Sequence, residues 1–491
     1  MSPAGAGPVR RALVHGGGVA AAMAALALAR AFGRLGVELL WVDTGDGPSA
    51  HTALTAPPDL ATFHRLLGLD DRALTRGAAA TFNMGQQFAG WGGDDSAFLH
   101  AYGDAGTPFA SLPFLQHWTR ARHAGLGVGL EDFCLAAAAA KQGRTGGLAD
   151  SATRQSVKTG WHVDAAAYAR LLRVGCVAAG VRIIKGQSVR PIPSDDAARL
   201  DAVGVDGETI AADLFVDTRG TLIDLLDNDE MVPYASPCDR LLRASLAPFD
   251  PLPLYSRVAA HGAGWTALTP LADRTAVAFH YDSACLSDDE ARTALGAMTG
   301  RPVHDAAEMV EGGDRLRPWI GNVIALGGAA GTPPPLDGAE LLLLQLGVAQ
   351  LVLLWPLDRG AMPEADIYNG ELNGSRARVK DFTAQHFRLN GRADAFWSAA
   401  RARPISDELA AKIELFSARG MFAHFGHEAH VEDGWALCMA GHAIVPRGFD
   451  PQILSVEEPA LMREFQRQLG AVAADVRAME SHAEALVRAR G

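Results

Sequence analysis

The segment LVHGGGVAAAMAA, residues 13–25, constrains the fold more than any other part of the chain. Three successive glycines separate a short apolar run from an alanine-rich run, a pattern typical of a buried strand, a tight turn and a helix. We expect a strand over 12–14, a helix over 19–35 and a second buried strand over 37–42. These elements in this order predict an α/β fold with a Rossmann-like nucleotide-binding unit.

Within this unit, Gly16, Gly18 and Ala21 form a G-x-G-x-x-A fingerprint. The first glycine permits the tight turn, the second lets the backbone approach a diphosphate, and the alanine keeps the helix close to the strand. Asp43, at the end of the second predicted strand, stands where an acid can bind ribose hydroxyls. The pattern favours the ADP part of FAD or NAD, and the alternative is an alanine-rich buried helix after a glycine turn.

The same region also fits a secretion signal. An arginine pair at 10–11 precedes an almost uncharged run, and small residues at 27–29 could form a cleavage site. Against this interpretation, His15 and the glycines interrupt the apolar run, and the nucleotide-fold pattern continues beyond it without a break. The apolar run at 341–355 is too short for a membrane span and contains two glutamines. We therefore expect no membrane segment.

Composition narrows the class of partner. The 491 residues are 48% hydrophobic and 20% charged, as in a large folded protein. The formal net charge of -12 argues against nucleic acid and anionic membranes, because both require a basic face. Five widely separated cysteines without a C-x-x-C pair favour a reducing compartment, so we expect a cytoplasmic protein that binds small molecules.

Two further segments predict more of the cofactor site. Residues 213–220 (DLFVDTRG) are typical of a strand that ends in a polar turn at Asp217. Residues 322–331 (NVIALGGAAG) are typical of a strand that enters a glycine-rich loop at Gly327, before a long apolar helix over about 339–354. A loop aimed at the start of this helix offers a second place for an anion or a flavin edge. Two such places suit a dinucleotide.

Several strings, spread in one order over nearly the whole chain, resemble the flavin-dependent tryptophan halogenase family. They include HGGGVAAAMAA, ATFNMGQQFAGW, GWHVDAAAYARLLR, LFVDTRG, PCDRLL, NVIALGGAAGTPPPLDGAEL and RVKDFTAQHFRLNGRADAFW. The resemblance implies FAD, delivered as FADH2 by a transiently bound flavin reductase, which with O2 oxidises a halide to hypohalous acid. A lysine of the family directs this species onto an indole or a similar aromatic small molecule.

The expected organisation is one compact unit. An FAD-binding subdomain of the flavin monooxygenase and glutathione reductase type is interleaved with a substrate subdomain over 1–358, and a mostly helical region covers 359–491. The flavin part is expected at about 10–50, 155–240 and 315–358, and the substrate part at 51–154 and 241–314. A homodimer is a further expectation.

The chain departs from the family at the catalytic lysine. The family motif resembles T-F-K-L-G, whereas this chain has TFNMG, so Asn83 stands in the place of the lysine. An amine can be N-halogenated or can donate as a cation, but a carboxamide nitrogen is barely nucleophilic. No lysine precedes Lys141, so no sequence neighbour replaces the amine. The alternative is that Asn83 is an ordinary polar residue in a loop.

A second departure affects the carboxylate that the family pairs with the lysine. The family's P-L-E-S corresponds here to Pro335, Leu336, Asp337 and Gly338, so the acid is one methylene shorter and the adjacent hydroxyl is lost. We assign Asp337 to catalysis, Pro335 and Leu336 to the cofactor, and the amides of Gly338 and Ala339 to a halide or substrate. The alternative is that Asp337 only caps the following helix.

Two other family signatures are eroded. The W-x-W-x-I-P motif, thought to exclude monooxygenation, is WTALTP here, which keeps Trp265 and Pro270 as halide or substrate candidates but has Ala267 and Thr269 between them. The flavin-covering G-E-x-T segment corresponds to residues 52–58, where only its threonine is kept.

Three histidines, His424, His427 and His430, invite a metal interpretation, but their spacing is not H-E-x-x-H. We expect a structural or surface role for them and no metal. The leading hypothesis is a halogenase-family enzyme with chemistry altered by Asn83. The alternatives are a catalytically degenerate flavin-binding relative and a flavin monooxygenase.

Overall fold

The computed structural model describes residues 7–226, 231–234 and 236–491, and the chain divides into two units. The first unit comprises Met1–Ala80, Val163–Ser236 and Glu311–Ala377, and the second comprises Thr81–His162, Pro237–Val310 and Arg378–Gly491. Each unit is therefore assembled from three separated segments of the chain. The expected division into flavin and substrate segments remains a prediction.

The predicted nucleotide-binding elements are confirmed. β1 (Arg11–His15) leads into α1 (Gly18–Phe32), a short 3-10 turn covers Gly33–Leu35, and β2 (Glu38–Asp43) follows. β1 and β2 pair in parallel, with Val14 opposite Trp41. The glycine turn thus lies at the carboxyl end of a parallel strand, where open α/β sheets bind ligands.

β1 is a central strand of a six-stranded sheet in the first unit. The order is β21, β22, β13, β1, β2, β9, and all pairs are parallel except β21 with β22. The predicted strands near 213–220 and 322–331 are confirmed as β13 and β22. The remaining bounds are β9 Arg182–Lys185, β13 Leu214–Asp217, β21 Trp319–Ile320 and β22 Val323–Ala325.

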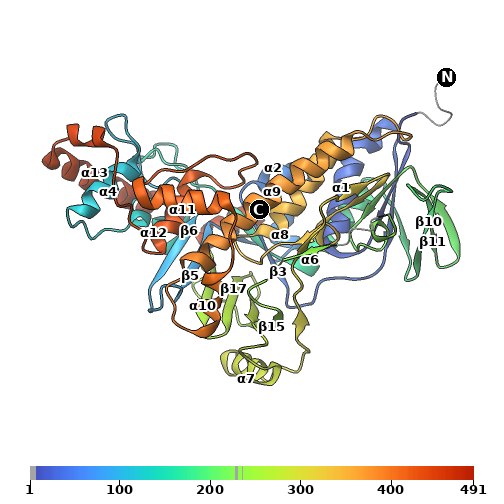
Figure 1. Cartoon of the computed structure of the whole chain (residues 1–491), viewed down its shortest axis with the longest axis horizontal. Coiled ribbons are helices and arrows are strands. Elements are labelled where there is room, and N and C mark those ends of the chain that lie inside the picture. Colours follow the sequence, from blue (N-terminus) through green and yellow to red (C-terminus); the bar gives the residue numbers. More distant parts are fainter. Residues whose placement is uncertain (1–6, 227–230, 235) are drawn as a thin grey trace. The chain divides into compact units, whose positions relative to one another are not determined.

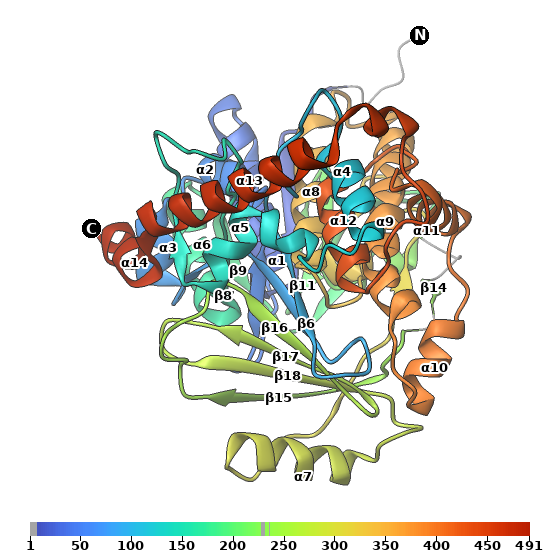
Figure 2. The same cartoon turned by 90° about the vertical axis from the view of Figure 1, so that its left-hand side faces the viewer.

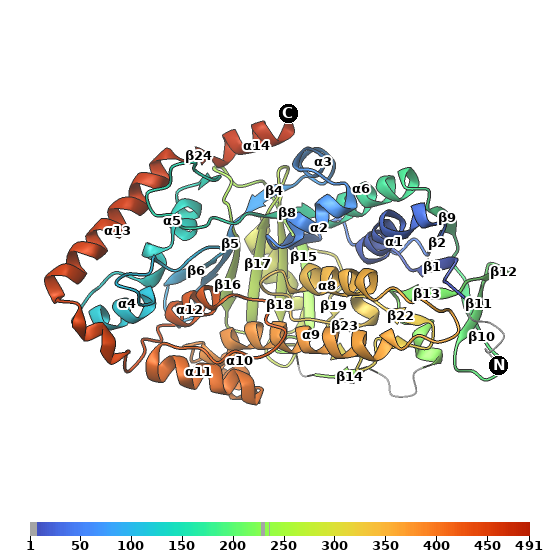
Figure 3. The ribbon, with the colours of Figure 1, turned by 90° about the horizontal axis from the view of Figure 1, so that it is seen from above.

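α1 is a core helix of the first unit. Its residues from Ala21 to Leu28 are fully buried, and it packs on α6 (Ala165–Ala178), as Figure 3 shows. The two helices approach closely at Gly175, where a Cβ would lie 2.8 Å from a Leu26 methyl group. Residues 18–35 are long and apolar enough to cross a membrane, a property shared by buried core helices and by N-terminal signals, and 56% of this window is buried.

The first unit also contains a small antiparallel sheet formed by β10, β11 and β12, which is visible in Figure 1. The predicted long apolar helix is confirmed as α8. The bounds are β3 Ala53–Ala56, α2 Leu60–Leu67, α3 Asp71–Gly77, β10 Val189–Pro193, β11 Leu200–Val205, β12 Glu208–Ala211, β14 Val232–Pro233, β20 Gly313–Asp314, β23 Gly331–Thr332 and α8 Ala339–Leu353.

The second unit contains a seven-stranded sheet in the order β19, β15, β18, β17, β16, β5, β6. Figure 2 shows β15 to β18 side by side with α7 against β15. α7 begins at a capping box in which Ser287 and Glu290 exchange hydrogen bonds, and it buries Leu295 on the sheet. The bounds are β5 Gly85–Ala89, β6 Ala97–Ala101, β15 Arg240–Leu246, β16 Ser256–His261, β17 Gly264–Pro270, β18 Thr275–Tyr281, α7 Asp288–Thr299 and β19 Glu308–Met309.

The C-terminal region is mostly helical, as expected. α9 (Glu364–Leu389) starts in the first unit and ends in the second, and the short strand β24 pairs with β7 from an earlier segment of the second unit. The bounds in this region are α10 Ala395–Ala402, α11 Asp407–Arg419, α12 Glu432–Gly441, α13 Glu458–Ala478, β24 Glu480–Ser481 and α14 His482–Arg490. The remaining bounds, from earlier in the chain, are β4 Thr81–Asn83, α4 Phe114–His123, α5 Leu135–Lys141, β7 Arg144–Thr145 and β8 Gly160–Asp164.

Candidate functional site

The turn between β1 and α1 has no room for side chains. Gly16 has a φ of +124°, and a Cβ there would lie 2.1 Å from Thr218 Oγ1. A Cβ on Gly17 would lie 2.5 Å from the carbonyl oxygen of Asp46. The Trp41 indole N–H, from the neighbouring strand β2, donates to the Gly16 carbonyl at 2.9 Å and holds the turn in place. Glycine is therefore required here by close approach of two other segments.

The start of α1 is available to an anion. Its N-cap is Gly17, and the described residues provide neither a side-chain cap nor an acid in the first turn. The first amide N–H groups of a helix lack intrahelical partners and attract negative charge. Ala21 is fully buried and lets the helix start pack close to the sheet. A glycine cradle before an uncapped helix fits the diphosphate of a dinucleotide such as FAD.

The Gly16→Ala variant tests this cradle. The new methyl group meets Thr218 Oγ1 and the backbone is strained at positive φ, so the free energy of unfolding should fall by about 3 kcal/mol. The matched control is Gly36→Ala, since Gly36 has a φ of +88° with open space around its Cβ position. It should lose only about 1 kcal/mol. Thermal unfolding compares the two, and equal losses would contradict a crowded cradle.

Asp217 is enclosed by the protein. Its carboxylate is 0% exposed and accepts from the amides of Arg219 at 3.0 Å, Leu222 at 2.7 Å and Ile223 at 3.1 Å, and it lies 3.0 Å from His15 Nδ1. Burial alone would raise the pKa of Asp217, but the hydrogen bonds from His15 and these amides outweigh it and lower the pKa. The carboxylate shapes the loop after β13.

Asp43 lies at the end of β2, as predicted. Its carboxylate pairs with Arg173 and accepts from the Gly45 amide at 3.0 Å. The same guanidinium lies 4.9 Å from the centre of the Trp41 ring. A ribose at this position would share the carboxylate with Arg173, and the predicted ribose contact remains a prediction.

The second glycine loop packs against α1. Gly327 begins a 3-10 turn with a φ of +58°, and a Cβ there would lie 3.0 Å from the Ala20 methyl group on α1. Leu336 is buried, whereas Pro335 is exposed. Of the two, only the Leu336 side chain belongs to the interior beside this loop.

The start of α8 differs from the sequence-based alternative. Its N-cap is Gly338 in the left-handed region, so the interpretation of Asp337 as the cap is wrong. Asp337 itself has a φ of +53° and is 2% exposed. A Cβ on Gly338 would lie 2.8 Å from the Thr55 carbonyl oxygen and 3.3 Å from Pro57 Cδ. The predicted flavin-covering loop therefore lies against the predicted halide site, with Ala339 as the first residue of α8.

Asn83, in the second unit, is a buried strand residue. It ends β4, pairs with Gly160 of β8, and is 0% exposed, so the alternative of a loop residue is wrong. Its Oδ1 accepts from the Gly85 amide at 3.0 Å, and its Nδ2 donates to the Tyr102 hydroxyl at 3.4 Å. Because the backbone amide can only donate, it fixes the orientation of the carboxamide. Asn83 presents a donor to Tyr102.

The aromatic neighbours of Asn83 are not among the residues predicted from the sequence. His100 lies edge-on to Tyr102 with 5.7 Å between ring centres, and its ring centre lies 4.9 Å from that of Phe382. The string FLHAY offered a signal, because alternating residues of a strand share one face.

A buried lysine of the second unit is likewise absent from the sequence-based predictions. Lys412 is 2% exposed, donates to Glu428 at 2.6 Å and to the Ala423 carbonyl at 3.0 Å, and its Nζ lies 4.8 Å from the centre of the Trp435 ring. Its contacts hold the segment before α12 in place.

Trp265 and Pro270 lie at opposite ends of β17. The Trp265 ring stacks on His280 at 4.9 Å, and within the described chain neither Trp265 Nε1 nor His280 Nδ1 has a hydrogen-bond partner. Burial lowers the pKa of His280 to about 3, so this imidazole is neutral. The Pro270 carbonyl accepts from Thr81 Oγ1 at 2.7 Å. Pro270 thus anchors the strand that carries Asn83.

The three histidines lie outside helices and do not converge. His424 pairs with Glu432 at 2.8 Å, and His430 stacks on Phe382 at 3.7 Å. The described residues contain no group of three side chains that could hold a metal ion.

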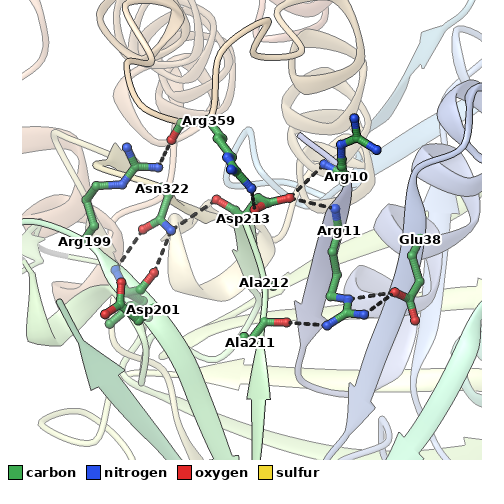
Figure 4. A pocket seen from close by; sticks show the side chains of 11 residues that line it. Arg10, Arg11, Glu38, Arg199, Asp201, Ala211, Ala212, Asp213, Asn322 and Arg359 are labelled. Carbon is green, nitrogen blue, oxygen red and sulfur yellow. Dashed lines mark hydrogen bonds and ion pairs between the residues drawn. The ribbon is translucent and has the colours of Figure 1, made fainter. Parts of the chain in front are cut away.

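A cavity of about 550 Å³ lies at the opposite end of β1 from the glycine turn (Figure 4). Several of its polar groups contact one another: Arg11 pairs with Glu38 at 2.7 Å, and Asp213 accepts from the amides of Arg10 and Arg11. A second cavity, of about 560 Å³, lies in the second unit between α4 and α12. None of the predicted site residues lines either cavity.

Two solved flavin-dependent halogenases share this fold. BrvH from Brevundimonas sp. BAL3 superposes with a TM-score of 0.91 at 28% identity, covering 98% of this chain and 99% of its own. Xcc4156 from Xanthomonas campestris gives 0.91 at 29% identity and covers 98% of each chain. The α/β fold is therefore that of the flavin-dependent halogenases.

The tryptophan halogenase family pattern matches residues 11–458, so the chain belongs to the tryptophan halogenase family. Tryptophan 7-halogenase KtzQ from Kutzneria sp. is 27% identical over 446 residues, which cover 84% of this chain and 82% of KtzQ. The family is flavin-dependent and implies FAD as the cofactor.

Proposed function

We propose that this protein is an FADH2- and O2-dependent enzyme of the halogenase family that acts on an indole-like ring, with chemistry altered by Asn83. The carrying observation is the buried carboxamide of Asn83, whose orientation is fixed by Gly85 and Tyr102. We also propose a cytoplasmic location, self-association as a homodimer, and a separate flavin reductase as a transient partner.

The first unit would hold the cofactor. Gly16, Gly18 and the α1 start would bind the diphosphate, and the Gly327 loop would lie beside the flavin, with the proposed ribose contact at Asp43. When bound in reduced form, FAD supplies the electrons that activate O2. Asp217 contributes indirectly, by holding the loop after β13.

Asn83 would act through hydrogen bonds alone. Its Nδ2 is a neutral donor, so it can hold an electronegative atom but cannot supply the positive charge or nucleophilicity of an amine. The Tyr102 hydroxyl, which accepts from Asn83, is a second group that can donate to the same ligand. We therefore expect slower halogen transfer than an ammonium group would support.

Reconstitution tests this function. The purified protein is supplied with FAD, a flavin reductase, NADH, and chloride or bromide, and products from indoles and phenols are identified by mass spectrometry. Halide-dependent product that falls by about tenfold or more in Asn83→Ala supports the proposal. The matched control is Asn390→Ala, since Asn390 is also a buried asparagine of the second unit whose amide donates within the protein. An equal loss in both variants would contradict a specific role for Asn83.

A monooxygenase is the second candidate, because Ala267 and Thr269 replace the residues of the motif thought to exclude that reaction. Hydroxylated product without halide would favour it. FAD binding without any product would favour a degenerate relative.

A further inference from the structure

An ion pair spans the glycine turn of the first unit. Arg219, from the loop after β13, pairs with Asp46, from the loop after β2. The stem of Arg219 packs against the turn, since its Cγ lies 3.3 Å from the Cβ position of Gly16. The Asp46 carbonyl oxygen lies 2.5 Å from the Cβ position of Gly17 and 3.4 Å from that of Gly18. A cation and an anion therefore meet directly at the predicted diphosphate cradle.

Hydrogen bonds of the neighbouring backbone hold Arg219 in this position. Its amide donates to Asp217 at 3.0 Å, and the neighbouring Thr218 donates to the His15 carbonyl through both its amide and its hydroxyl at 3.0 Å. The backbone of Arg219 is thus fixed to the end of β1. The Arg219 side chain is 45% exposed, so it can turn without disturbing the core.

Asp46 is held more loosely. Its side chain is 56% exposed, and its carboxylate accepts from the Thr44 hydroxyl at 2.6 Å in the same loop. Exposed ion pairs contribute little to stability, because water solvates both partners when they separate. A diphosphate carries more negative charge than one carboxylate and offers a guanidinium bidentate contacts.

We propose that Arg219 is a cofactor-binding residue and that Asp46 occupies it until the FAD diphosphate takes its place. On binding, the Asp46 carboxylate moves into solvent and Arg219 moves to the phosphate oxygens beside the start of α1. The inference rests on the proposed function, because it requires FAD at this cradle. It predicts that Arg219 strengthens FAD binding and that Asp46, its ion-pair partner, weakens it.

The test measures the FAD dissociation constant by flavin fluorescence, without turnover. Arg219→Gln should weaken binding by about tenfold, as expected for loss of a charged hydrogen bond, and Arg219→Lys should recover part of it. Asp46→Asn should strengthen binding about two- to fivefold, because it removes the competitor and keeps the contact to Thr44. The matched controls are Arg11→Gln and Glu38→Gln, an exposed pair at the other end of β1, which should leave binding unchanged.

The outcomes separate the two claims. If the wild-type chain binds no FAD, the proposed function and this inference are both wrong. If it binds FAD but Arg219→Gln leaves the dissociation constant unchanged, or Asp46→Asn weakens binding, only the inference is wrong. Weaker binding in both variants would mean that the pair merely braces the two loops.

Discussion

Asn83→Lys combined with Asp337→Glu should raise halogenation of an indole by on the order of a hundredfold over the wild-type chain, because a positioned cationic donor is typically worth this much in a transition state. The double variant introduces an amine at 83 and a carboxylate one methylene longer at 337, the two groups that the proposed function treats as altered. Product is measured with bromide under saturating FADH2 supply, and the rate is compared with those of the single variants.

The control for this gain is Asn83→Met with Asp337→Glu, which has a side chain of similar length but no charge. Both variants lose the acceptor for the Gly85 amide, at a cost of about 1 to 3 kcal/mol, so their thermal midpoints should be alike. If the lysine variant is equally stable but shows no gain in halogenation, the segment at 52–58, rather than Asn83 and Asp337, limits the reaction.

Asp217→Ala should destabilise the first unit by about 3 to 5 kcal/mol, the second large effect. The variant leaves three backbone amides and His15 without their buried acceptor. Urea unfolding measures the loss. Asp213→Ala is the comparison, since that carboxylate lies at the other end of the same strand and is less enclosed, and an equal loss would contradict a special role for Asp217.

The same carboxylate gives a pH dependence of known sign. The pKa of Asp217 is lower in the folded chain than in the unfolded one, so its ionised form favours folding. This stability is fully present above the unfolded value of about 4 and is lost as the pH falls through the lowered folded value. The difference in unfolding free energy between wild type and Asp217→Asn should therefore shrink below about pH 4. A constant difference would contradict this linkage.

The sequence was sufficient for the nucleotide-binding elements because their signals are local. Alternation of apolar runs with glycines defines β1, α1, β2, β13 and α8 within short windows. Asp217 shows the limit of such reasoning. An acid at a strand end has the same pattern whether it binds a ligand or the backbone amides of its own loop, and only the fold distinguishes the two.

The Asn83 site was harder to predict. Tyr102 reaches Asn83 because β5 and β6 pair in antiparallel register, with Gly85 opposite Ala101. That register depends on the whole sheet. Aspartate favours the N-cap position, so the sequence alone offers the cap as an alternative role for Asp337, but the N-cap of α8 is Gly338 in the left-handed conformation.

The close contact between Gly338 and Thr55 limits the residues that this turn accepts. A Cβ at 338 would lie 2.8 Å from the carbonyl oxygen of residue 55, so a larger residue there requires a shift of the segment at 52–58. A substitution at 338 alone therefore gives a poorly packed variant. Directed evolution of this turn should succeed only when both segments are diversified in the same library.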